Sequence, residues 1–186
     1  DGINSYFISK VTRDAGIKVA LSGLGGDELF GGYETYNFLP TWGWIAKYWG
    51  KAPSQMKNSL LRILTIMVKS PVHKQKVLRL NLVKDFYGLY AAVRANGWGS
   101  KNFSLFSNDF LQRIIIEIGE YDILSCLRES GEEKDHWRLT QKLEMKNYMG
   151  WRLLRDTDSM SMAHGLEVRV PLIDDTLVNY IMSMPQ

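Results

Sequence analysis

The hydrophobic positions of this 186-residue chain follow helical spacing over most of its length. Apolar side chains three or four residues apart predict amphipathic helices, and five segments show that pattern. Their apolar positions are Ile3, Phe7 and Val11; Leu60, Leu64 and Met67; Leu82, Phe86, Leu89 and Val93; Tyr148, Trp151 and Leu154; and Leu177, Val178 and Ile181.

Residues that start or stop helices bound these segments. Gly16 is placed to end the first helix, and Pro53-Ser54 precedes the second. Asn96-Gly97 follows the third. The longest helix is expected from about Glu132 to about Arg155, and the last is expected to begin at Asp174-Asp175.

Only the segment Ile17–Leu21 is typical of a fully buried strand. Leu166–Val170 alternates with a period of two, but Pro171 ends it at once, which predicts at best a short extended piece. A single buried strand leaves its backbone groups unpaired. We therefore expect partner strands from upstream sequence or from another copy, and we expect the chain to be part of a longer protein.

Composition indicates a globular chain, with 45% apolar and 23% charged residues. A net charge of +3 suits polyanionic ligands without requiring nucleic acid. The single cysteine, Cys126, excludes an internal disulfide, favours a reducing compartment and is expected to be a buried structural thiol. No apolar run is long enough for a membrane span, and no signal peptide is evident. These features predict a cytoplasmic chain without a nucleic-acid or membrane partner.

Several conspicuous residue sets are expected to be structural. Large apolar side chains at helical spacing are predicted to fill the core; they are Trp42, Trp44, Trp49, Met145, Met149, Met160 and Met162. The three histidines, His73, His136 and His164, are too far apart to indicate a zinc site. The basic residues between Lys69 and Lys84 are expected to form a solvated helix face.

A glycine-rich segment, Ser22–Tyr33, directly follows the predicted strand and reads Ser-Gly-Leu-Gly-Gly-Asp-Glu-Leu-Phe-Gly-Gly-Tyr. Glycines allow backbone N–H groups to close on an anion, and the start of a helix favours negative charge. A carboxylate such as Asp27 beside a phosphate site could hold Mg²⁺. The alternative is a tight strand-to-helix turn with an acidic first helical turn.

A second segment, Leu154–Asp174, contains several carboxylates and hydroxyls at the end of the longest predicted helix. Glu167 and Arg169 could form an ion pair on one face of an extended strip. Asp156 and Asp158 could cap helix ends. Neither segment alone establishes a function.

Together, the two segments resemble the signatures of the glutamine-dependent asparagine synthetase family. Ser22–Tyr33 is similar to the first signature, and Met160-Ser-Met-Ala through Glu167–Asp174 is similar to the second. The resemblance implies an α/β fold of the adenine-nucleotide-alpha-hydrolase (pyrophosphatase-loop ATP) type with a large helical subdomain. Residues 1–186 would be the C-terminal part of one synthetase domain, predominantly helical with one core parallel strand. The upstream strands and a glutaminase domain would lie outside these residues.

The resemblance also implies a reaction. ATP and aspartate, or a related carboxylate, react on Mg²⁺ to give an acyl-adenylate, and ammonia from glutamine then displaces AMP. Ser22 and Gly23 would contact the nucleotide, Gly25 and Gly26 would allow close backbone approach, and Asp27 would bind Mg²⁺. The ammonia would come from a separate glutaminase domain. The resemblance leaves homodimerisation open.

Two positions depart from the family pattern. Leu24 replaces the usual glutamate, and Ser159 replaces the usual lysine or arginine, so the catalytic residues stay unassigned. In the folded protein, Arg152 or Arg155, or a lysine elsewhere, could take the place of the missing basic residue. The family's Ser-Gly-Gly-x-Asp-Ser phosphate loop is also absent, which predicts that these residues alone are inactive. Glu28 would hold the loop to the following helix.

Three functions are therefore compared. The first is an ATP-dependent amide ligase, and the second is a catalytically degenerate family member that binds nucleotide or acts as a scaffold. The third is a helical interaction domain with a slightly basic surface, which would require both signatures to be coincidental. The length and order of the signatures favour the ligase.

Overall fold

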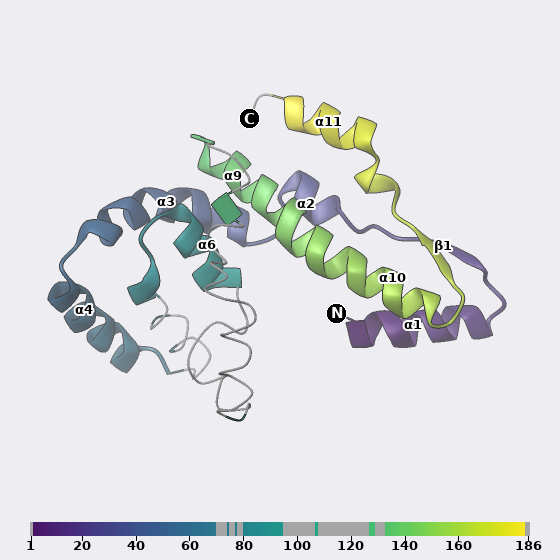
Figure 1. The fold of residues 1–186 in the computed structure, drawn as a ribbon, viewed down its shortest axis with the longest axis horizontal. Coiled ribbons are helices and arrows are strands. Elements are labelled where there is room, and N and C mark those ends of the chain that lie inside the picture. The colour runs from purple at the N-terminus through teal and green to yellow at the C-terminus, as the bar shows by residue number, and fades with distance from the viewer. Residues whose placement is uncertain are drawn as a thin grey trace. The chain divides into compact units, whose positions relative to one another are not determined.

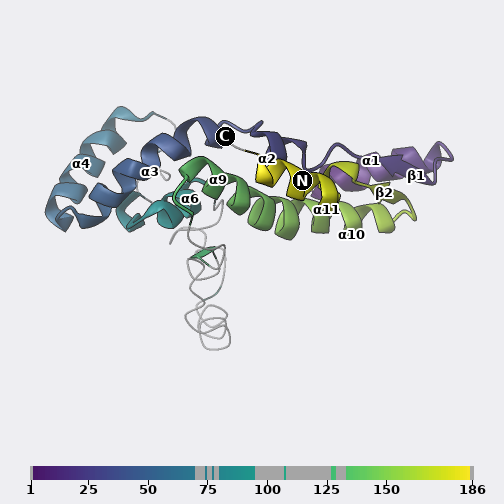
Figure 2. The same ribbon diagram turned by 90° about the horizontal axis from the view of Figure 1, so that it is seen from above.

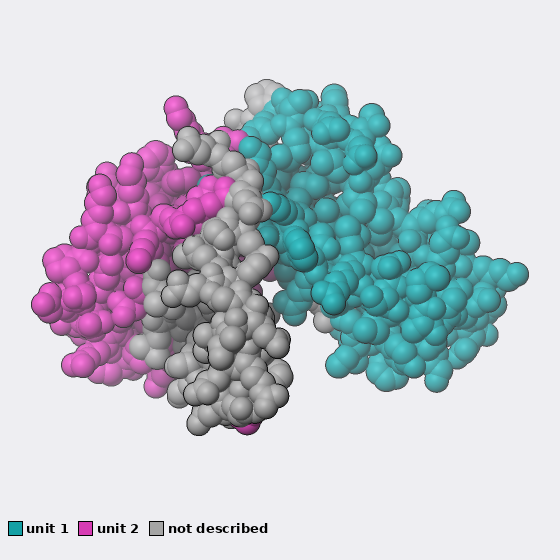
Figure 3. Space-filling model, in the orientation of Figure 1, with its two compact units in different colours: residues 1–37, 137–186 teal, residues 38–136 magenta. Residues whose placement is uncertain are grey.

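The computed structural model describes residues 2–69, 74, 77, 80–94, 107, 127–128 and 133–184. The chain divides into two compact units, residues 1–37 with 137–186, and residues 38–136 (Figure 3). The predictions for Cys126, His73 and Asn96-Gly97 lie outside the described residues. No helix in the described ranges combines the length and hydropathy needed to cross a bilayer.

In the first unit, helices α1 (Gly2–Asp14) and α10 (Arg155–Met162) lie side by side (Figures 1 and 2). Ser9 and Ser161 are both buried, and side chains this small allow the two helices to approach closely. The Asp156 carboxylate accepts a hydrogen bond of 3.1 Å from the backbone N–H of Gly2. Asp156 therefore satisfies an otherwise unpaired donor at the start of α1, as the sequence predicted.

Helix α1 ends near Gly16, whose φ of 85° is a left-handed conformation that glycine adopts readily. The predicted stripe of Ile3, Phe7 and Val11 is exposed, however, because the buried face of α1 carries small residues. The helix was predicted correctly and its buried face was not.

The sheet consists of two short parallel strands, β1 (Val19–Leu21) and β2 (Glu167–Arg169). The prediction of a single, fully buried core strand is wrong. Pro171 ends the second strand early, yet its three residues are enough to pair with β1. Val19 lies opposite Glu167 in this pairing. Leu21 is 76% exposed, so this strand is apolar but is not buried. Partner strands from outside residues 1–186 stay a prediction.

A continuous helical run joins α9 (His136–Leu143), η3 (Glu144–Leu154) and α10. The predicted helix is confirmed from His136 onward and extends seven residues past Arg155, to Met162. Its predicted start at Glu132 lies outside the described residues. The middle segment, η3, is a π-helix of 11 residues. Long π-helices are rare, and sequence periodicity gave no sign of this one.

The π-helical turn changes which side chains face the core. Each turn closes with an i→i+5 hydrogen bond, so residues four to five apart share a face. The buried positions are Glu144, Met149 and Leu153, whereas Trp151 is 70% exposed. Within the predicted stripe, Trp151 is exposed whereas Tyr148 and Leu154 are half-buried, so the prediction missed the fully buried positions.

The last helix, α11 (Asp175–Ser183), follows the short turn η4 (Pro171–Ile173). The Asp174 carboxylate accepts hydrogen bonds from the N–H groups of Thr176 and Leu177, at 2.9 and 3.4 Å. This N-cap confirms the predicted helix start.

The second unit contains most of α3 (Thr35–Lys51), together with α4 (Ser54–Met67), η1 (Leu80–Leu82) and α6 (Phe86–Arg94). The helices predicted around Leu60–Met67 and Phe86–Val93 are confirmed, although Leu82 belongs to the separate short turn η1. Buried apolar side chains from these elements form the core. They are Leu39, Ala46, Leu61, Val83, Phe86, Leu89, Tyr90, Ala91 and Ala92.

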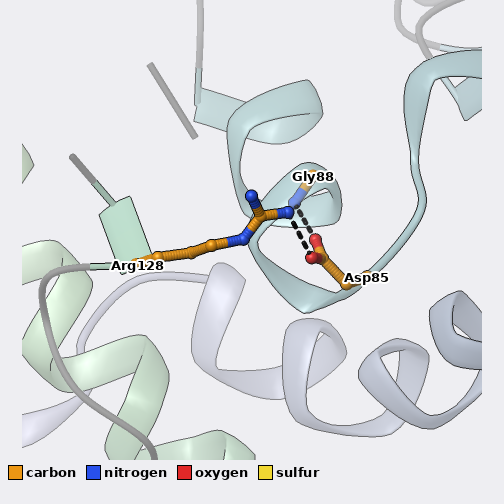
Figure 4. Close-up of polar contacts among 3 residues, drawn as sticks. All are labelled: Asp85, Gly88 and Arg128. Atoms are coloured by element: carbon orange, nitrogen blue, oxygen red, sulfur yellow. Dashed lines mark hydrogen bonds and ion pairs between the residues drawn. The ribbon is translucent and has the colours of Figure 1, made fainter. Parts of the chain in front are cut away.

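Asp85 fixes the start of α6 (Figure 4). Its Oδ1 accepts a hydrogen bond of 2.9 Å from the N–H of Gly88, and its Oδ2 lies 2.7 Å from Arg128 Nη2. The ion pair is partly exposed and is expected to contribute only about 0–1 kcal/mol, so the cap is the more important contact.

Some residues predicted to fill the core do not. Trp42 and Trp44 on α3 are exposed, as is Met162 on α10, whereas Met149 is buried as predicted. Trp49 is half-buried, and its indole N–H donates a hydrogen bond of 2.7 Å to the Leu80 carbonyl.

Candidate functional site

The two signature segments meet at the carboxyl ends of the two strands. Ser22 follows β1, and its N–H donates a hydrogen bond of 2.8 Å to the carbonyl of Arg169, the last residue of β2. Because the strands are parallel, the loops that follow them leave the same edge of the sheet. That edge is where open α/β sheets bind ligands.

Gly25 is the point of closest contact between the two segments. Its φ is 92°, and a Cβ atom there would lie 2.5 Å from Ile173 Cγ2 and 3.4 Å from Met149 Sδ. The neighbouring Gly26 would place a Cβ 3.3 Å from Leu172 Cδ1. Both glycines are therefore explained by packing of the first loop on the second segment. Their predicted contact with a nucleotide stays a prediction.

Gly23 differs from these two glycines. It is exposed, and no atom lies within 4 Å of the position a Cβ would take. The hydroxyl of Ser22 accepts a hydrogen bond of 3.3 Å from the N–H of Leu24, which fixes the turn. The accessible part of the loop backbone is thus at Gly23.

Asp27 lies in the first turn of the short helix α2 (Gly26–Phe30), and its side chain is exposed. Its carboxylate lies against Gly32, where a Cβ would overlap Asp27 Oδ1. Carboxylate oxygen is a ligand that Mg²⁺ prefers. Among the described residues, no group of three or more His, Cys, Asp or Glu side chains could hold a metal. Mg²⁺ binding by the exposed Asp27 carboxylate stays a prediction.

Glu28 ties the loop to the helix that follows. It is 1% exposed, and its Oε1 accepts a hydrogen bond of 2.7 Å from the Tyr33 hydroxyl. Its backbone carbonyl accepts a second, of 2.6 Å, from the Tyr36 hydroxyl in α3. Burial, and then the contact with the Glu28 carboxylate, raises the pKa of Tyr33 far above its usual range. This geometry matches the structural role predicted for Glu28.

The whole chain, residues 1–186, matches the family model described as asparagine synthase. The chain belongs to this family. Over 181 residues it is 26% identical to the asparagine synthetase (glutamine-hydrolyzing) 1 of Bacillus subtilis (strain 168). That alignment covers 97% of the chain but 27% of the relative, so the chain spans about a quarter of the relative's length. No solved structure matches the chain.

Membership of the asparagine synthase family is consistent with the observed architecture. A mostly helical chain with a two-stranded parallel sheet fits part of an α/β domain. The two signatures that carried the resemblance are separated by more than 120 residues in sequence, and the fold brings them into contact at Gly25 and Ile173.

The π-helix places Tyr148, which the sequence did not assign to the site, and Arg152, which it named as a replacement for the missing basic residue, beside the first signature. Tyr148 packs edge-to-face on Tyr33, with ring centroids 5.7 Å apart. The Arg152 guanidinium lies 5.8 Å from the Tyr148 ring centroid. Arg152 is therefore linked through Tyr148 to the first signature, while Ser159 lies exposed on α10.

Gln141 on α9 was also missed. Its Nε2 donates a hydrogen bond of 2.7 Å to the Leu29 carbonyl, which supports the end of α2 from the core side. By contrast, the predicted ion pair between Glu167 and Arg169 is present at 2.7 Å on the surface. It is expected to contribute about 0–1 kcal/mol.

Proposed function

We propose that the protein that contains this chain is an ATP-dependent amide ligase acting on aspartate or a related carboxylate. The observation that carries the proposal is the contact between the two family signatures at the carboxyl ends of parallel strands. On this proposal, residues 1–186 are the C-terminal part of one synthetase domain of the pyrophosphatase-loop ATP type. The relative's greater length supports the further strands and the glutaminase domain that the proposal requires.

The proposed roles follow the accessibility of each residue. Ser22 and Gly23 contact the nucleotide, because the backbone at Gly23 is open. Gly25 and Gly26 give the loop its shape and bring it close to the second segment. The exposed Asp27 carboxylate holds Mg²⁺ together with the phosphates. When bound, Mg²⁺ neutralises phosphate charge and favours pyrophosphate as a leaving group.

The proposed reaction has two steps. An oxygen of the substrate carboxylate attacks the α-phosphorus of ATP, the bond to the bridging oxygen breaks, and pyrophosphate leaves. Ammonia then attacks the acyl carbon, loses a proton, and expels AMP to give the amide. In both steps this chain orients the phosphates with the Ser22–Asp27 loop, while the Glu28–Tyr33 contact keeps that loop in place.

Glutamine is the proposed ammonia source. The printed name of the Bacillus subtilis relative describes a glutamine-hydrolysing enzyme, which supports this choice.

An isotope-transfer experiment tests the adenylate directly. The intact protein is incubated with ATP, Mg²⁺, an ammonia source and aspartate labelled with ¹⁸O in its side-chain carboxylate. An acyl-adenylate transfers one labelled oxygen to AMP, which mass spectrometry detects. Unlabelled AMP, or the appearance of ADP in its place, would exclude the adenylate route.

A degenerate nucleotide-binding member of the family is the second candidate, favoured by Leu24 and Ser159. Neither side chain can carry the charge usual at its position. We expect Leu24→Glu to leave adenylate formation within about threefold if the position is idle, because the side chain is only half-buried. A large loss would mean that the apolar side chain shapes the acceptor site. Binding of ATP without label transfer from any acid would favour the degenerate candidate.

A further inference from the structure

Helix α4 carries an apolar stripe that faces outward. Met56, Leu60, Ile63 and Met67 are spaced four, three and four residues apart and therefore lie on one face of the helix. All four are exposed, by between 43% and 72% of their surface. Figures 1 and 2 both place α4 at the edge of the second unit.

The stripe is separate from the face that α4 packs into its unit. Leu61 and Lys57 are the buried residues of the helix, and η1 packs against it. The Lys57 ammonium donates a hydrogen bond of 3.1 Å to the Gly50 carbonyl. The helix is thus apolar on two faces, and only one of them contributes to the core.

Further exposed apolar side chains lie close by in sequence. Ile66, beside the stripe, is 81% exposed. On the preceding helix, α3, the aromatic side chains of Trp42, Trp44 and Tyr48 are exposed as well. Trp and Tyr are the residues enriched where protein meets the headgroup region of a bilayer.

The charge of this region is strongly one-sided. Between Thr35 and Lys84 the sequence has no aspartate or glutamate, although the whole chain has 20. The same stretch has nine basic residues: Lys47, Lys51, Lys57, Arg62, Lys69, Lys74, Lys76, Arg79 and Lys84. Those placed on or beside α3 and α4 with exposed side chains are Lys47, Lys51, Arg62 and Lys69.

We propose that the exposed apolar stripe of α4, together with the basic residues beside it, binds an anionic lipid surface. An apolar stripe accompanied by Lys, Arg and interfacial aromatic residues is the composition of helices that lie in the headgroup region. Acidic lipids carry the negative charge that the stretch lacks. Each basic residue near the membrane surface contributes about 1 kcal/mol to binding. Such peripheral contact needs no spanning helix, and it revises the prediction that the chain has no membrane partner.

Two other occupants fit the surface less well. A second copy related by two-fold symmetry would place the same basic stretch against itself, which is electrostatically unfavourable. Nucleic acid would use the positive charge but would leave the Met, Leu and Ile side chains without a partner.

Vesicle co-sedimentation of the intact protein tests the proposal. We expect binding to vesicles of phosphatidylcholine with phosphatidylglycerol, little binding to phosphatidylcholine alone, and weaker binding at high salt. Ile63→Glu should lower the partition coefficient at least about tenfold, because it removes apolar contact and adds a negative charge.

A matched control separates the stripe from charge alone. Asn58 is exposed on α4 away from the stripe, so Asn58→Glu adds the same charge and should reduce binding only by a few-fold. Equal losses for Ile63→Glu and Asn58→Glu, or no binding of the unaltered protein to acidic vesicles, would overturn the proposal. So would protection of an Ile63→Cys thiol from a water-soluble maleimide in the lipid-free intact protein, since the stripe would then be covered by protein. Unchanged circular dichroism of each variant controls for folding.

Discussion

At the scale of single residues, the glycines of the first signature have different reasons to be glycine. Gly25 has a positive φ and no room for a Cβ, whereas Gly23 has neither constraint. Sequence could predict that the loop needs glycines, but it could not separate those needed for packing from those open to a ligand. The partner of Gly25 is Ile173, nearly 150 residues later in the chain.

Gly25→Ala is therefore expected to destabilise the protein. The left-handed backbone and the 2.5 Å approach of Ile173 together predict a loss of about 2–4 kcal/mol in the free energy of unfolding. Urea denaturation of the intact protein measures it. Gly23→Ala is the control, with an expected change of about 0.5 kcal/mol or less. Similar losses for both variants would contradict the packing of the two segments.

The contact between Tyr33 and Glu28 gives a pH-dependent prediction. The pKa of Tyr33 is raised in the folded protein above its ordinary value of 10.0. Its contribution to stability is therefore complete below about pH 10 and is lost as the pH rises above that value, where the unfolded chain releases the proton first.

Tyr33→Phe should cost about 1–2 kcal/mol at neutral pH, because the buried Glu28 carboxylate loses a donor. The stability difference from the unaltered protein should shrink above about pH 10. Denaturation curves across that range provide the test, with the exposed Tyr180→Phe as a control for hydroxyl loss. A difference that stays constant with pH would contradict the assigned contact.

At the scale of elements, the helices were predictable and their buried faces often were not. Caps and breakers such as Gly16 and Asp174 act locally, so the sequence carries them directly. The faces of α1 and α4 were assigned by assuming that apolar stripes are buried. The α1 stripe is exposed, and in the predicted α4 stripe Leu60 and Met67 are exposed while Leu64 is half-buried. The π-helix was not predictable because the apolar pattern of the sequence carries no signal for an i→i+5 register.

Two neighbouring substitutions on η3 test which of its side chains are buried. Leu153→Ala should cost about 2–4 kcal/mol because the side chain is buried. Trp151→Ala removes the larger side chain but should cost about 0.5 kcal/mol or less, since that side chain is exposed. Thermal denaturation compares the two. The reverse order would contradict the assignment of Leu153 to the buried face and of Trp151 to the exposed face.

At the scale of the whole molecule, the family resemblance predicted more about the site than local sequence patterns could. Spacing alone gave no reason for Ser22–Tyr33 to meet the segment that ends at Asp174. The resemblance assigned both segments to one function, and the structure adds that Ile173 packs on Gly25. The second strand was underestimated, because a three-residue segment before a proline is a weak strand signal on its own.

The metal assignment is tested in the intact protein by Asp27→Asn, which keeps the size of the side chain and removes its charge. Loss of a Mg²⁺ ligand should lower Mg²⁺-dependent exchange between ATP and pyrophosphate by at least about a hundredfold. The unfolding free energy should change by about 0.5 kcal/mol or less because the side chain is exposed. Unchanged exchange would remove Asp27 from the proposed site.

The most direct test of the central claim is acid-dependent exchange of labelled pyrophosphate into ATP by the intact protein. If the two signature segments form a carboxylate-activating site, exchange should require Mg²⁺ and one carboxylic acid, with aspartate the first candidate. It should continue without ammonia, because adenylate formation precedes amide formation. Absence of exchange with every acid tested, while ATP still binds, would contradict the claim.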